Sequence, residues 1–219
     1  GKLGLGARRA LGKSLAASGY EQAIVLPNSL KSAFIPFFAR IPLRTGWRGE
    51  YRYGLLNDVR VLDKKRYPLM VQRYAALALP KGAEPLQTFP FPSLQVNQHQ
   101  RPQLLTKFAL QLDRPLLIIC PGAEYGPAKR WPEHYFAEVA DKKIRAGWQV
   151  WLMGSAKDNE VTDAIRNLLL DEERHHCFNL AGSTSLGEAI ELIACADAVL
   201  SNDSGLMHIT AALQKPLAV

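Results

Sequence analysis

The sequence predicts an α/β fold with parallel sheets, divided between two domains. In the second half, short apolar runs alternate with amphipathic segments of helical length. Those runs are continuously apolar, which is typical of parallel strands covered on both faces. A proline-rich stretch separates this half from a first half of different composition.

The first half predicts helices around a short strand. Its basic and apolar residues alternate at helical spacing near the start, and Gly19 suits a helix end. Pro36 falls within a phenylalanine-rich helix and is expected to kink it. The expected elements are a helix over 7–18, a strand over 23–26, a helix capped by Asn28 or Ser29 that runs through Phe34, Phe37 and Phe38, a basic, glycine-broken loop over 44–60, and a helix over 68–78.

Five prolines between positions 80 and 102 stiffen extended chain and remove backbone donors. We therefore expect one domain over 1–80, a linker over 81–102 and a second domain over 103–219. In the second domain the strands are expected at 116–120, 149–153, 178–180 and 198–201, and the helices at 133–146, from about 156 to 170, at 186–196 and at 205–213.

The composition is that of a globular protein, with 47% hydrophobic residues and a net charge of +7. A basic chain favours an anionic partner. Nucleic acid is disfavoured, because the basic residues are scattered and lack an aromatic stacking pattern. No membrane-spanning run or signal peptide is found, so we expect a cytoplasmic protein. The three cysteines have apolar neighbours and no CxxC spacing, which predicts buried free thiols and no metal site.

The chain starts at Gly1 and stops within an apolar run typical of an opening strand. We therefore expect both domains to be incomplete in this chain.

Three polar or glycine-rich turns follow predicted strands directly: residues 121–132, Gly154-Ser155, and residues 202–205. In an open parallel sheet, ligands bind at the carboxyl ends of the strands. The amides of the helix starting at Gly205 attract an anion, and Lys129 adds a positive charge, so the pattern favours a diphosphate ligand. The alternatives are a plain helix cap at Asp203, a core histidine at His208 and a solvated turn around Lys129.

Two runs in this half resemble the donor-domain signatures of family 9 glycosyltransferases, namely residues 128–132 (AKRWP) and 202–208 (NDSGLMH). In the first half, residues 25–33 (VLPNSLKSA), 44–50 (RTGWRGE) and 52–60 (RYGLLNDVR) resemble the second type of heptosyltransferase in that family. The resemblance covers nearly the whole chain.

The resemblance implies a GT-B fold, with two Rossmann-like domains and the active site between them. It also implies a metal-independent, cofactor-free, inverting transfer of heptose from ADP-heptose to the phosphorylated Kdo-heptose core of lipopolysaccharide. The protein would then act at the membrane surface, peripheral to the inner membrane. The family's general base is expected outside this chain, so the chain alone is expected to be inactive.

The resemblance also implies roles for single residues. Lys129 would stabilise the leaving diphosphate. The donor-binding residues would be Tyr125, Lys129, Glu160 (with Asp158 as its rival), Thr184, Asp203, Ser204, Gly205 and His208. The acceptor-binding residues would be Lys31, Arg44 and Arg48. Two other readings stay open: another GT-B enzyme acting on a nucleotide-sugar, such as a glycosyltransferase or epimerase, and a non-catalytic binding protein.

Overall fold

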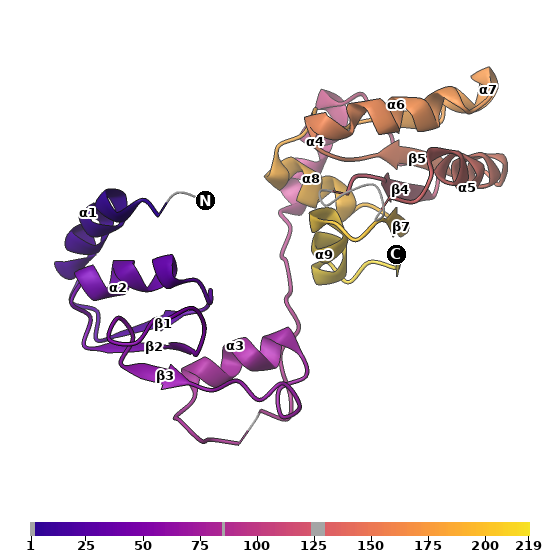
Figure 1. Cartoon of the computed structure of the whole chain (residues 1–219). Helices are drawn as coiled ribbons and strands as arrows, with labels where there is room; N and C mark the ends of the chain where they lie inside the picture. The colour runs from indigo at the N-terminus through magenta and orange to yellow at the C-terminus, as the bar shows by residue number, and fades with distance from the viewer. Residues whose placement is uncertain (1–2, 85, 124–129) are drawn as a thin grey trace. The chain divides into compact units, whose positions relative to one another are not determined.

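The computed structural model describes residues 3–84, 86–123 and 130–219, in two compact units (Figure 1). Unit 1 is Gly1–Pro90 and unit 2 is Phe91–Val219, so their boundary falls inside the predicted linker. Each unit contains a parallel sheet, which confirms the predicted fold class. None of the described helices is long and apolar enough to cross a membrane.

Unit 1 has its strands in the order β1-β2-β3, all parallel. Its elements are α1 (Leu5–Ala16), β1 (Gln22–Val25), the 3-10 helix η1 (Leu30–Ala33), α2 (Phe34–Phe38), β2 (Leu43–Trp47), β3 (Asp58–Arg60) and α3 (Met70–Ala78). The helices were predicted, with η1 and α2 together forming the phenylalanine-rich one. Ser29 precedes η1 but makes no capping bond. Instead, the Leu30 amide donates to Glu50 Oε2 at 2.7 Å.

The prediction of a loop over 44–60 is wrong, because β2 and β3 lie within it. Thr45 is fully buried, and its hydroxyl lies 3.1 Å from Asp58 Oδ2 and 3.2 Å from Gln22 Nε2. Side chains from neighbouring strands therefore satisfy the hydrogen-bonding groups of Thr45, a polar residue in a stretch whose sequence is typical of a loop.

Helix α1 packs against α2 at very short range (Figure 1). Gly12 makes this possible, because a Cβ atom there would lie 2.6 Å from Phe38 Cβ and 2.7 Å from the Ile35 carbonyl oxygen. Because α1 and α2 pack so closely, side chains from both helices lie next to one another on the surface of unit 1.

Unit 2 has its strands in the order β6-β5-β4-β7-β8, also parallel. Its elements are η2 (Gln98–Gln100), α4 (Arg101–Lys107), β4 (Leu116–Cys120), α5 (Glu133–Arg145), β5 (Gln149–Leu152), η4 (Ala156–Asp158), α6 (Asn159–Asn167), α7 (Asp171–Arg174), β6 (Cys177–Asn179), α8 (Leu186–Ile193), β7 (Ala198–Ser201), α9 (Gly205–Ala212) and β8 (Leu217–Ala218). The helix predicted to reach about residue 170 ends at Asn167, and the separate short helix α7 begins just beyond the predicted end.

The sheet of unit 2 is covered on both faces. Successive residues of β4 alternate between two buried clusters, and β4 and β5 are buried along their whole length. Helices α4, α8 and α9 cover one face, and α5 and α6 cover the other (Figure 1). This explains why both strands are continuously apolar in sequence.

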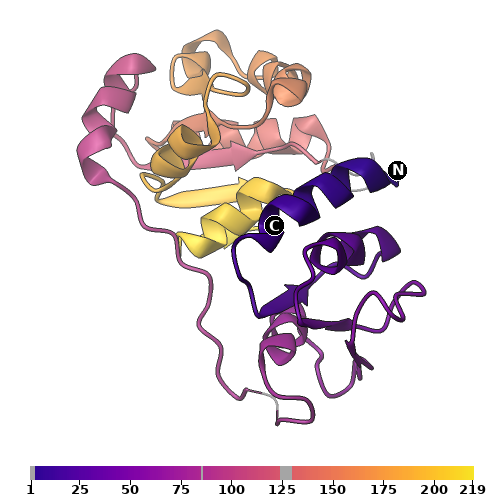
Figure 2. The same cartoon turned by 90° about the vertical axis from the view of Figure 1, so that its left-hand side faces the viewer.

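An extended stretch over residues 86–97 leads into η2 and α4 (Figures 1 and 2). Its second part is fixed to unit 2, since the Leu94 amide donates to the Ala212 carbonyl at 3.0 Å and the Asn97 amide to Glu191 Oε1 at 2.7 Å. Helix α4 was not predicted. It begins at Arg101, inside the segment predicted as linker, and it accommodates Pro102 because a helix tolerates proline in its first turn.

Candidate functional site

The three turns predicted to form a site do meet at the carboxyl ends of β4, β5 and β7. Together they surround a cavity of about 920 Å³ in unit 2, which we call the strand-end cavity. This volume is within the usual range for small-molecule sites. Its lining includes Cys120, Gly122, Ala123, Arg130, Met153, Gly154, Ser155, Lys157, Asp158, Thr184, Leu186, Asp203, Ser204, Gly205 and His208.

Asp158 lies at the junction of two of these turns. Its Oδ2 accepts from the Ser155 amide and from the Ser155 hydroxyl, both at 2.7 Å. A Cβ atom at Gly122 would lie 2.6 Å from Asp158 Oδ1, and one at Gly154 would lie 2.8 Å from Asp158 Cβ. Both glycines are therefore required for this close approach. Oδ1 has no hydrogen-bond partner within the described residues, so it can accept from a ligand.

Glu160, which the resemblance placed at the ligand ribose, is absent from the described lining, whereas its rival Asp158 is part of it. Glu160 lies in the exposed first turn of α6. The distinguishing signal was present in the sequence: Ser155 and Asp158 have the spacing of a capping box, which fixes Asp158 beside the β5 turn.

Asn202 connects the β7 turn to the β4 turn. Its Nδ2 donates to the Pro121 carbonyl at 2.7 Å, and its Oδ1 accepts from the Trp131 amide at 3.3 Å. The residue is only 8% exposed. Sequence reasoning gave Asn202 no role of its own, because an asparagine after a strand does not reveal which neighbouring turn it will contact.

Helix α9 begins at the cavity. Ser204 is its N-cap residue, but its side chain makes no capping bond and its hydroxyl instead lies 3.3 Å from Ser201 Oγ. The first-turn amides of α9 are therefore not capped by Ser204 and can bind an anion. His208, one turn further on, lines the same cavity, as do Asp203 and Gly205.

Thr184 reaches the cavity from the turn before α8. Gly182 in that turn has a φ of +69° and donates its amide to the Gly154 carbonyl at 2.9 Å. This contact holds the Thr184 turn against the β5 turn. Tyr125 and Lys129 lie outside the described residues.

Two of the predicted acceptor cations lie at the carboxyl edge of the sheet in unit 1. Lys31 is in η1 after β1, and Arg48 follows β2 directly. Buried Arg52 holds their two loops together, donating to the Pro27 carbonyl at 2.6 Å and also to the Trp47 carbonyl. Burial lowers the pKa of its guanidinium.

Arg44 does not join Lys31 and Arg48. It lies near the amino end of β2, about 13 Å along the strand from Arg48. Its guanidinium donates to the carbonyls of Leu55 at 2.7 Å and Ile41 at 2.5 Å.

No group of three or more potential metal ligands occurs among the described residues. The first-turn amides of α9 and the cation Arg130 border the strand-end cavity, and both kinds of group suit an anion.

Comparison with known proteins agrees with this geometry. The model of glycosyltransferase family 9 (heptosyltransferase) matches residues 8–218. Lipopolysaccharide heptosyltransferase 2 of Salmonella typhimurium and lipooligosaccharide heptosyltransferase 2 of Haemophilus influenzae are each 54% identical to the chain, over 99% of its length and 64% of theirs. The chain thus spans less than two thirds of these relatives.

A solved structure, that of E. coli ADP-heptose lps heptosyltransferase II, superposes with a TM-score of 0.91 at 53% identity. The match covers 97% of this chain and 66% of that one. The fold, the strand-end cavity and the extent of the family match lead to one conclusion: the chain belongs to glycosyltransferase family 9, the heptosyltransferases, and has a GT-B fold.

Proposed function

We propose that this protein transfers heptose from ADP-heptose to the phosphorylated Kdo-heptose core of lipopolysaccharide, acting at the cytoplasmic surface of the inner membrane. The observation that carries the proposal is the strand-end cavity. Within the described residues, it combines first-turn amides of α9 that the Ser204 side chain does not cap with an Asp158 Oδ1 that has no hydrogen-bond partner, and these groups suit the phosphates and the ribose of a nucleoside diphosphate. The names of the relatives that align with 99% of the chain support heptose as the sugar.

In this proposal unit 2 binds the donor. The first-turn amides of α9, with Asp203, Ser204 and Gly205, bind the diphosphate and sugar, and His208 contacts the same groups. Asp158 accepts from a ribose hydroxyl, while Thr184 lies beside the adenine. All of these residues line the same cavity.

Unit 1 would bind the acceptor through Lys31 and Arg48, whose loops share the carboxyl edge of its sheet. Cations fixed beside this edge suit the phosphates of the acceptor. Transfer would be a direct displacement at the anomeric carbon. The acceptor hydroxyl loses its proton to a base, and the bond to the ADP oxygen breaks with the electron pair leaving on ADP. Lys129 and the α9 amides would stabilise that developing charge.

The donor site is tested by titrating the protein with ADP-heptose, using Asp158→Asn and Glu160→Gln as a matched pair. Each removes one negative charge in the same turn of chain, but only Asp158 lines the cavity. Loss of a charged hydrogen bond costs roughly 1.5–3 kcal/mol, so Asp158→Asn should weaken binding about ten- to a hundredfold. Glu160→Gln should bind as the wild type does. Equal losses in both variants would contradict the assignment.

The reaction itself is tested with a full-length protein that contains this chain and the segment expected to carry the general base, by following ADP release with the lipopolysaccharide acceptor present and absent. Acceptor-dependent release from ADP-heptose supports the transferase. Equal competition by UDP-sugars would instead indicate another nucleotide-sugar enzyme, and tight donor binding without release would indicate a binding protein.

A further inference from the structure

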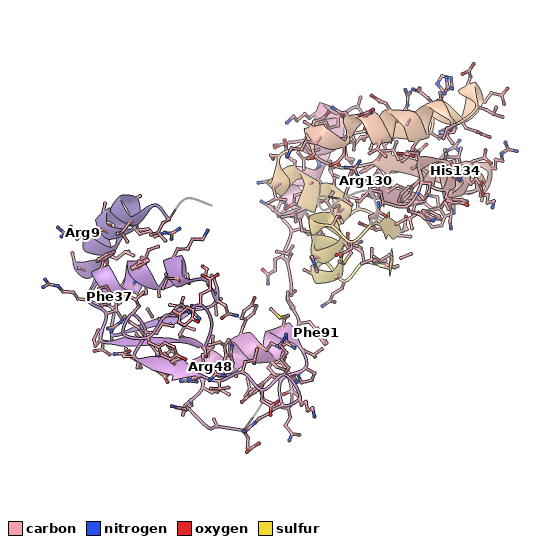
Figure 3. The ribbon with its side chains drawn as sticks, in the orientation of Figure 1. Arg9, Phe37, Arg48, Phe91, Arg130 and His134 are labelled. Carbon is pink, nitrogen blue, oxygen red and sulfur yellow. The ribbon has the colours of Figure 1, made fainter. Side chains whose placement is uncertain are left out.

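Unit 1 contains a cavity that the proposed reaction does not use. It has a volume of about 850 Å³ and lies between α1 and α2, so we call it the α1–α2 cavity. It is lined by Leu5, Gly6, Arg9, Lys13, Ala16, Phe37, Phe38, Arg40 and Arg44. Figure 3 shows Arg9 on α1 near Phe37 on α2, with Arg48 well apart from both.

All the charged residues that line this cavity are positive. Four of its lining residues are cations and none is acidic. Within the described residues, no salt bridge involves Arg9, Lys13 or Arg40. Residues 1–44 carry seven lysines and arginines but a single acidic residue, Glu21. The surface around the cavity is therefore strongly positive, and its partner must be negative.

Apolar side chains lie directly among these cations. Leu5 is 43% exposed and Phe37 is 40% exposed. The Phe37 ring packs edge-on against Phe38, and the Arg44 guanidinium carbon lies 5.9 Å from its centre. Cations that surround exposed aliphatic and aromatic groups are typical of helices that lie in a membrane interface.

Arg40 adds an independent observation. It has a φ of +55° in the turn that ends α2, where its amide donates to the Phe37 carbonyl and the Ile41 amide to the Pro36 carbonyl. Glycine is the usual residue at this left-handed position, because any side chain is strained there. Arg40 therefore places a charged side chain at the end of α2 at a position where glycine would be less strained, and this residue lines the cavity.

We propose that the α1–α2 cavity and its rim form a docking surface for an anionic phospholipid bilayer. Arg9, Lys13 and Arg40 would contact headgroup phosphates, and Phe37 would enter the interface. A small free anion fits less well, because such a ligand needs converging donors and Arg44 is already bound to two carbonyl oxygens. This proposal adds a membrane contact to the proposed function. It rests on that function in one respect, namely that a lipid-linked acceptor would be found at a membrane.

The test is sedimentation of the protein with vesicles of phosphatidylcholine alone or mixed with phosphatidylglycerol, without donor or acceptor. Each cation near an anionic surface adds about fivefold in affinity, so Arg9→Glu with Lys13→Glu should weaken binding to the anionic vesicles by at least about tenfold. The matched control is Lys64→Glu with Lys65→Glu. It makes the same charge change on an exposed turn of the same unit and should lose far less.

Arg40→Gly separates binding from folding. It removes a cation and relieves the left-handed strain, so it should weaken vesicle binding about fivefold while the melting temperature stays equal or rises. Phe37→Ala should weaken binding to anionic vesicles without changing its salt dependence.

Preferential binding to the anionic vesicles, lost in the cavity variants and kept in the control, supports the docking surface. Equal losses in the cavity and control variants would show that only net charge matters and would overturn it. Failure of the wild type to bind vesicles would overturn it too, even if inorganic phosphate bound to the cavity. Because neither donor nor acceptor is present, none of these results bears on heptose transfer.

Discussion

The two units hold the loops at their carboxyl edges by different means. In unit 2 two of the loops follow β4 and β5, which are buried along their whole length between two helical layers, and the third follows β7, which is partly buried. In unit 1 three of the four residues of β1 are not buried, and Arg52 holds the neighbouring loops with hydrogen bonds to their carbonyl groups. Apolar packing fixes the strands below the unit 2 site, so a few polar side chains such as Asn202 are enough to join its turns, and other polar groups stay available for a ligand.

The largest effects should come from removing each of these supports. Trp151 is fully buried in unit 2, so Trp151→Ala should lower its free energy of unfolding by about 3–5 kcal/mol. Arg52→Met removes the guanidinium hydrogen bonds to the Pro27 and Trp47 carbonyls in unit 1 and should cost about 2–5 kcal/mol. Thermal unfolding followed by hydrogen exchange would locate each loss. If Arg52→Met destabilised unit 2 instead, the comparison would fail.

A second pair of variants tests the loops themselves. Gly122→Ala places a Cβ atom against the Asp158 carboxylate, and Gly49→Ala places one 2.5 Å from the Asn28 carbonyl oxygen. Overpacking costs about 1–3 kcal/mol, so both should disturb their loops. Only Gly122→Ala should weaken ADP binding, by about tenfold or more, because only that loop borders the strand-end cavity. Calorimetric titration with ADP decides this, and an equal loss in Gly49→Ala would contradict the assignment.

An ion pair gives unit 2 a distinctive dependence on pH. Lys107 Nζ lies 2.6 Å from Glu188 Oε1 and holds α4 to α8. The Lys107 hydrogen bond, followed by those from Ser185, lowers the pKa of Glu188 from 4.5 to about 2. Because the folded-state pKa is depressed, this contribution to stability is complete above pH 4.5 and is lost as the pH falls towards 2.

Glu188→Gln should therefore be less stable than the wild type at neutral pH, and the difference should shrink as the pH falls through that window. Denaturant unfolding of both proteins over this range provides the measurement. In unit 1 the Arg60 hydrogen bond likewise lowers the pKa of Asp58, so Asp58→Asn is the matched variant there. A difference between wild type and Glu188→Gln that did not vary with pH would rule out the ion pair as its cause.

The smallest changes in stability are expected at two helix ends that share a left-handed backbone geometry but have different residues in that position. Gly147, two residues after the end of α5, has a φ of +88°, and Ala109, two residues after the end of α4, has a φ of +51°. Ala109→Gly should raise stability by about 0.5–1 kcal/mol, and Gly147→Ala should lower it by a similar amount. Opposite shifts in melting temperature are expected. Shifts of the same sign would show that packing, not backbone strain, dominates at these ends.

The sequence predicted the strands of unit 2 better than those of unit 1, because the two sheets differ in how their strands are buried. Strands β4, β5 and β7 are apolar runs, so their burial is visible locally. The polar residues of β2 and β3 become strand only because partners across the sheet satisfy Thr45 and Asp58, which no local pattern shows. Helix α4 was missed because proline was interpreted as a break, although it is allowed in a first helical turn.

The site was predicted to the level of its turns, and less well to the level of single side chains. Strand order brings the three turns together, and that follows from parallel topology. The choice between Asp158 and Glu160 depends on where η4 ends and α6 begins, a boundary that periodicity leaves uncertain by a residue or two. Arg44 and Arg48 are close in sequence, but the length of β2 places them at opposite ends of the sheet.

The cysteine in the strand-end cavity bears on redox chemistry. Cys120 is 1% exposed, and burial, together with the nearby Asp158 charge, raises the pKa of its thiol to about 12. At neutral pH the thiol therefore stays protonated, whereas the thiolate is the form that peroxides and alkylating agents attack. The site should therefore keep its ligand affinity during oxidative stress. A covalent inhibitor aimed at this sulfur would find almost no nucleophile to react with.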